Sequence, residues 1–197
     1  MTEPVSLSLT NFLNFVTKTG IQKLRFVEQL KRDEQFDFYG PLRDHIKRVH
    51  KADQPKKELE TALQGLTNKQ KTKCYPPVVK GYQKFWGRKK LEWIEPPKAI
   101  WKHADIVVNV APEVGLVIDG EVHVLKLYFR QERLTKERVC AINHLLEQQL
   151  RAKLTPEVQL GILDIHRSKF LPAVANPDYK HLLEAEAEMF RRYWDKP

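Results

Sequence analysis

Glu113 and Lys126 are the two residues of this chain whose types and spacing could perform chemistry together. They flank Asp119-Gly120, and an Asp-Gly pair between two apolar runs is typical of a two-residue hairpin turn. Such a turn fixes the strand register, and counting outward from it sets Glu113 directly opposite Lys126. A carboxylate and an ammonium group therefore meet among apolar neighbours. We expect Gly115, beside them on the same arm, to leave room for a ligand to approach.

Three interpretations of this pair follow from its chemistry. A simple cross-strand ion pair would add about 0.2–1 kcal/mol to the stability of the sheet. A pair that binds substrate without cleaving it would use the lysine to contact a phosphate. An active metal site would use Glu113 to hold Mg²⁺ and Lys126 to stabilise negative charge on a phosphoryl group. The residues alone leave these three possibilities open.

A magnesium site would need more than one acid. Mg²⁺ usually requires one or two carboxylates beside a phosphate, so Glu113 alone would bind it weakly. Asp105, at the start of a neighbouring strand, and Asp164, in the last strand, are the acids that could complete the site. Glu92 or Glu95, on the segment before the sheet, could also reach it.

Composition places the chain among ordinary folded proteins. It has 197 residues, of which 42% are hydrophobic and 30% charged, enough for one good core. No apolar run approaches the length that spans a bilayer, and the first residues lack the pattern of a secretory signal. Cys74 and Cys140 lie far apart without metal-ligand spacing, which favours a reducing compartment. We expect a cytoplasmic protein with no membrane partner.

The excess positive charge is confined to the middle of the chain. Residues 47–102 hold fifteen Lys and Arg against five Asp and Glu, while the formal net charge of the whole chain is +9. This asymmetry favours a polyanionic partner, with nucleic acid first and an acidic protein as the alternative.

Lysines and aromatic residues alternate in the second half of this basic segment. Nucleic-acid surfaces need both kinds, because cations neutralise phosphates and flat rings stack on exposed bases. In the alternative, the rings face the core and the lysines are merely solvated. The candidate nucleic-acid-binding residues are Lys69, Lys73, Lys80, Lys84, Trp86, Arg88, Lys89 and Lys90.

Apolar periodicity divides the chain into two unlike halves. Residues 1–92 read as short helices, interrupted at Pro76-Pro77, and form a helical basic subdomain. Residues 93–197 read as a strand over 106–111, the hairpin, a helix, another strand and a last helix. A helix between strands returns the chain parallel to its neighbour. The sequence thus predicts an α+β fold, with a helical N-terminal layer and a small mixed sheet flanked by helices.

This order, together with Pro112-Glu113 and Lys126, resembles the core of the PD-(D/E)XK (restriction-endonuclease-like) nucleases. In that family a helix, three meandering strands, a helix and a strand carry the site. An acid near the start of the second strand and an acid-x-lysine on the third hold a divalent metal. The resemblance maps the first acid to Glu113 and the lysine to Lys126. It maps the second acid to Val124, which cannot bind a metal, and so implies a degenerate site.

We therefore expect a protein that binds DNA or RNA through a nuclease-like fold with an incomplete metal site, and that cuts weakly or not at all. Lys126 would contact phosphate, and Glu113 would orient it or weakly hold Mg²⁺. No cofactor is required unless the protein is a nuclease. One alternative is an active Mg²⁺-dependent endonuclease with a migrated acid from Asp105 or Asp164. Another is a protein–protein interaction module.

Overall fold

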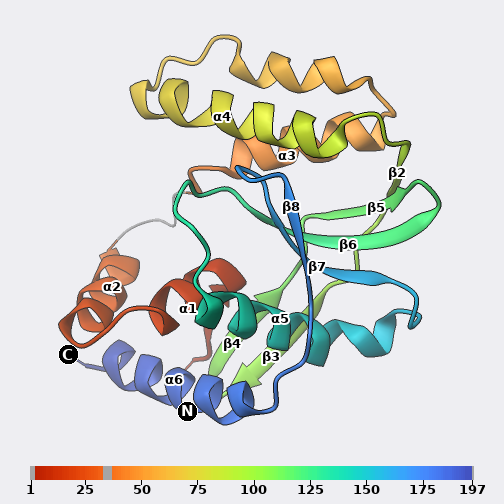
Figure 1. The fold of residues 1–197 in the computed structure, drawn as a ribbon. Coiled ribbons are helices and arrows are strands. Elements are labelled where there is room, and N and C mark those ends of the chain that lie inside the picture. Colours follow the sequence, from red (N-terminus) through yellow and green to blue (C-terminus); the bar gives the residue numbers. More distant parts are fainter. Residues whose placement is uncertain (1–2, 33–36, 197) are drawn as a thin grey trace.

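The computed structural model describes residues 3–32 and 37–196, and these residues form an α+β fold (Figure 1). The elements, in chain order, are β1 (Val5–Ser8), α1 (Leu9–Val16), α2 (Ile21–Arg32), α3 (Gly40–Lys51), η1 (Lys56–Leu63), α4 (Lys69–Trp86), β2 (Leu91–Ile94), β3 (Ala99–His103), β4 (Ile106–Val110), β5 (Val114–Ile118), β6 (Glu121–Tyr128), α5 (Lys136–Leu150), η2 (Arg151–Lys153), β7 (Gln159–Asp164), β8 (Lys169–Pro172) and α6 (Asp178–Trp194).

A five-stranded mixed sheet occupies the centre, in the order β2-β5-β6-β7-β8. β2, β5 and β6 are antiparallel neighbours, and the turn at Asp119-Gly120 joins the last two. β7 lies parallel to β6 after the chain has passed through α5, as the sequence predicts, and β8 returns antiparallel. β6 is thus the central strand.

A separate hydrophobic core lies on each face of this sheet, and β6 contributes apolar side chains to both cores. Val124 and Tyr128 point into a core shared with α1, α5, α6 and the second sheet. The alternate residues, Leu125, Leu127 and Phe129, point into a core shared with α3, η1 and α4. Figure 1 shows these two groups of elements on opposite sides of the sheet. Lys126 falls between Val124 and Tyr128, so its side chain belongs to the first face.

The strand predicted over 106–111 forms as β4, but it does not join the hairpin's sheet. It pairs antiparallel with β3 and parallel with β1, in a separate three-stranded sheet. β1 and α1 thereby pack with the C-terminal half of the chain, and α2 lies against α6. The division into 1–92 and 93–197 does not follow this packing. Pairing between segments so distant in sequence leaves no local signal.

The interruption expected at Pro76-Pro77 does not occur, since α4 continues through both prolines. Tyr75, Val78 and Tyr82 are fully buried along one side of this helix, against α3 and the sheet. Their burial outweighs the loss of two backbone donors, each of which costs a helix a few kcal/mol in isolation. Asn68 caps the helix by accepting hydrogen bonds from the backbone N–H groups of Gln70 and Lys71.

His50 gives the folding stability a predictable pH dependence. It hydrogen-bonds the Tyr82 hydroxyl at 2.8 Å and stacks on Trp86, and burial lowers its pKa to about 4. In the unfolded chain the His50 imidazole binds a proton near pH 6.5, whereas in the folded chain it binds one only near pH 4. Stability is therefore complete above pH 6.5 and falls as the pH drops toward 4. Urea unfolding should show a loss of about 2 kcal/mol between pH 7.5 and pH 5 from this residue.

The variant His50→Gln should flatten this pH dependence, whereas His181→Gln, at a highly exposed position, should keep it. Burial also lowers the pKa of His144, which leaves a residual slope of the same sign. An unchanged slope in His50→Gln would contradict the assignment.

Candidate functional site

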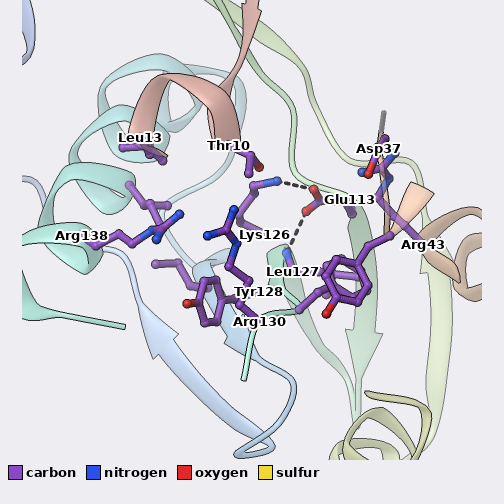
Figure 2. A pocket seen from close by; sticks show the side chains of 14 residues that line it. Thr10, Leu13, Asp37, Arg43, Glu113, Lys126, Leu127, Tyr128, Arg130 and Arg138 are labelled. Carbon is purple, nitrogen blue, oxygen red and sulfur yellow. Dashed lines mark hydrogen bonds and ion pairs between the residues drawn. The ribbon is translucent and has the colours of Figure 1, made fainter. Parts of the chain in front are cut away.

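Glu113 and Lys126 form a buried ion pair on the central strands, as the register count from the turn predicts. Val114 pairs with Leu125, and the backbone N–H of Glu113 donates to the Leu125 carbonyl, which places the two side chains opposite each other. The Lys126 ammonium contacts Glu113 Oε1, and Glu113 Oε2 accepts a 2.7 Å hydrogen bond from the Leu127 N–H (Figure 2). Both residues are less than a tenth exposed.

Burial changes the energetics of this cross-strand ion pair. Taking two charges out of water costs several kcal/mol for each ion, and their attraction offsets that cost only where the remaining polar atoms also find partners. Both carboxylate oxygens of Glu113 do find partners. The Lys126 ammonium and the Leu127 N–H thus fix the Glu113 carboxylate in position.

Gly115 does not open a path to the pair. A Cβ atom at this position would come within 2.6 Å of the Ile94 carbonyl oxygen and 2.8 Å of the Ile94 side chain. Gly115 pairs with Ile94 across β5 and β2, so the absence of a side chain lets the neighbouring strand approach closely. The expectation that it leaves room for a ligand is wrong.

A pocket lies directly beside the pair, and both residues line it (Figure 2). Its volume is about 90 Å³, which is room for several water molecules, each needing about 10–15 Å³ by the same measure. Tyr128 and Ile162 of the sheet and Leu13 and Ile142 of the covering helices form much of its wall.

Cations outnumber acids in this pocket. Lys126, Arg43, Arg130 and Arg138 line it, against Glu113 and Asp37. Figure 2 shows side chains from α1, α3, α5 and β6 surrounding one space.

The pocket is also lined by the first turns of three helices. Thr10 lies in the first turn of α1, and Arg138 in that of α5. Tyr39 and Arg43 mark the start of α3. The first N–H groups of a helix carry partial positive charge, so these ends favour an anion. An anion therefore suits the pocket better than a divalent cation.

Arg138 is the most constrained of these cations. One terminal nitrogen donates to Asn14 Oδ1, and the guanidinium lies 5.6 Å from the centre of the Tyr128 ring. Its buried Nε–H has no partner among the described residues. Burial lowers the pKa of Arg138 below its usual value and raises that of Tyr128. Arg43, by contrast, is paired with Asp37.

The structure does not bring the expected acids to Glu113. Asp105 is exposed in the turn between β3 and β4, in the other sheet. Asp164 is buried on β7, where its carboxylate accepts from the backbone and guanidinium of Arg167. Glu92 and Glu95 pair with lysines at the surface. Across residues 3–32 and 37–196, no three metal-ligating side chains come together.

The candidate nucleic-acid residues fall into two groups. Lys69, Lys73, Lys80 and Lys84 are exposed on one side of α4, within an arc of about 60° at 3.6 residues per turn. We name these four residues the lysine stripe. Within the described part of the chain, none of the four forms an ion pair.

Most of the candidate residues at the end of this segment contact other parts of the protein. Trp86 stacks on His50 at 4.5 Å, Lys89 caps the helix through the Phe85 carbonyl, and Lys90 pairs with Glu92. Arg88 is exposed. Because Tyr75 and Tyr82 are buried as well, this helix presents cations with little aromatic surface for bases.

Sequence reasoning missed most of the pocket. Arg43, Arg130, Arg138 and Asp37 are ordinary surface residues in their local patterns, and only the packing of α1, α3 and α5 around β6 brings them together. Arg138 carried one usable signal, its position in the first turn after a Thr135 cap.

No family model matches this chain, and no curated protein matches it either. None of the helices in the described residues is both long and apolar enough to cross a membrane.

Removing one partner of the buried pair should be costly. Glu113→Gln keeps an acceptor for the Leu127 N–H but leaves Lys126 charged and unpaired, for an expected loss of about 3–5 kcal/mol in urea unfolding. The double variant Glu113→Leu/Lys126→Met should recover most of this loss, because no buried charge remains.

Glu92→Gln, at an exposed ion pair, is the matched control and should leave the free energy of unfolding nearly unchanged. If Glu113→Gln behaves like this control, the pair does not carry the stability assigned to it.

Proposed function

We propose that this protein binds nucleic acid through the lysine stripe and holds a phosphate in the pocket at Lys126, without efficient cleavage. The observation that carries the proposal is the pocket itself, in which three arginines and residues at the starts of three helices surround the buried Lys126. Such a site suits a phosphate, which is compact and negatively charged.

The order of the elements supports the nuclease-like part of the proposal. α4 precedes β2, β5 and β6, which are antiparallel neighbours, and α5 then leads to the parallel β7. The resemblance to the PD-(D/E)XK nucleases implies this order. β2 replaces the segment 106–111 as the first strand, and β3 and β4 are inserted after it. Glu113 and Lys126 remain at the positions that the resemblance assigns to the site.

The lysine stripe supplies affinity in this proposal. Its cations extend over about 22 Å of helix at 1.5 Å per residue, so they can contact several phosphates. Lys69 with Lys73, and Lys80 with Lys84, repel each other one turn apart, and a polyanion relieves that repulsion. α4 does not line the pocket but contacts one residue of its lining, since Tyr75, on the buried side of the helix, stacks on Tyr39 and donates to the Phe38 carbonyl.

We expect no efficient cleavage because Glu113 has no second acid at the motif position to help it bind Mg²⁺. Val124 stands at the second acid position, and Glu113 already accepts from Lys126 and the Leu127 N–H. The competing cations make Mg²⁺ binding weaker still.

The binding proposal predicts a steep salt dependence. Fluorescence anisotropy with labelled DNA and RNA should give a dissociation constant that rises linearly with salt on logarithmic axes. Replacing the four lysines of the stripe with alanines should weaken binding and lower the slope by about 3.6, since each phosphate contact on a duplex contributes about 0.9.

The matched control replaces four exposed lysines elsewhere, Lys98, Lys102, Lys169 and Lys180. It removes the same charge and should lower the slope much less. Salt-independent binding, or equal effects of the two quadruple variants, would contradict the proposal. Co-purification with one acidic protein that resists nuclease treatment would favour the interaction-module alternative.

Incubation with plasmid, linear duplex, single-stranded DNA or RNA should give no cleavage with Mg²⁺ or Mn²⁺. Cleavage that disappears in both Glu113→Ala and Lys126→Ala, while each variant still binds, would instead establish the endonuclease alternative.

A further inference from the structure

We propose, building on the proposed function, that the pocket at Lys126 recognises the terminal phosphomonoester of a nucleic-acid end rather than a phosphodiester within the strand. The inference combines the size of the pocket, the charge around it and the donors left without partners. It assigns the pocket to end recognition and the lysine stripe to the adjoining strand.

The size of the pocket suits a phosphate group. About 90 Å³ is open to the centres of water molecules, which is enough for a phosphate. A phosphodiester is linked to a sugar on both sides, so burying one would bring two bulky groups to the pocket. A terminal phosphate is linked on one side only. Its three free oxygens can enter while the rest of the strand stays outside.

The charge of the pocket fits a dianion. After Glu113 and Asp37 are matched with Lys126 and Arg43, two arginines remain among the residues that line it, Arg130 and Arg138. A terminal phosphate carries a charge near −2 at neutral pH, whereas a phosphodiester carries −1. The excess of two cations over acids among the lining residues therefore favours the terminal group, and Glu132, which lies outside the lining at 3.9 Å from Arg130, offsets part of the charge of that arginine.

The donors around the pocket are suited to the extra oxygens. The Nε–H of Arg138 is buried without a partner among the described residues, and Asn14 holds the same guanidinium in place. Arg130 is about half exposed, and its nearest acid, Glu132, lies 3.9 Å away. Arginine presents several donors in a fixed plane and can contact two phosphate oxygens at once.

The test compares one labelled oligonucleotide with a 5′-phosphate, a 3′-phosphate or hydroxyls at both ends. Anisotropy titrations of the full chain should give at least about tenfold tighter binding for one phosphorylated end, the effect of one charge-assisted hydrogen bond. The 5′ and 3′ arms identify which end is recognised. Unlabelled inorganic phosphate at millimolar concentration should reduce this preference.

Variants separate the pocket from general charge. Arg130→Gln and Arg138→Gln should each bring the ratio between phosphorylated and unphosphorylated ends close to one. Arg133→Gln removes an exposed cation three residues from Arg130 that does not line the pocket, and should keep the wild-type ratio. Circular dichroism melting of each variant establishes that it is folded. Arg130→Gln, whose side chain is the more exposed, remains informative if Arg138→Gln unfolds.

Equal affinity for all three oligonucleotides, with a steep salt dependence, would overturn end recognition and leave the proposed function standing. Absence of salt-dependent binding to any of them would overturn both. A preference for phosphorylated ends that persists unchanged in Arg130→Gln and Arg138→Gln would also overturn the assignment to this pocket.

Discussion

A charged pair on a strand buried from both sides is the constraint around which this molecule is organised. β6 carries apolar residues toward two separate cores, and Lys126 is placed among them by its position on the strand. A lone ammonium there would be prohibitively costly, so the lysine requires Glu113, the residue directly before β5. The hairpin turn delivers that partner. The two charged side chains form part of the wall of the pocket.

The pocket gathers elements that are distant in the chain. α1 comes from the N-terminus, α3 from the layer above the sheet and α5 from the crossover between parallel strands. Each contributes lining residues from its first turn or N-cap, where the positive end of the helix dipole favours an anion. The packing of these helices around β6 also places three arginines at the pocket, and their charge favours an anion as the helix dipoles do. A site built this way is better suited to hold a phosphate than to collect metal ions.

The two halves of the proposed function rest on different physics. In the proposal, the lysine stripe would act through counterion release from an exposed helix, which gives affinity without selectivity. The pocket would act through its charge and fixed donors, which give selectivity at a single group. Tyr75, on the buried side of α4, stacks on Tyr39, which lines the pocket, whereas the lysine stripe lies on the opposite, exposed side of this helix. Tyr75 and Tyr82 of α4 are buried in the core, so the exposed side of this helix presents cations rather than aromatic rings.

The sequence by itself determined what depends on local patterns: the α+β class, the turn, the hairpin register and hence the Glu113–Lys126 pair. A two-residue turn leaves no freedom in how its arms align. Only the tertiary structure decided that 106–111 joins β1 in another sheet, that α4 continues through Pro76-Pro77, and that Asp105 and Asp164 lie apart from Glu113. It also brought Arg43, Arg130 and Arg138 together. These outcomes depend on which distant segments pack against one another, and the local sequence pattern of a segment does not show which other segments it will contact.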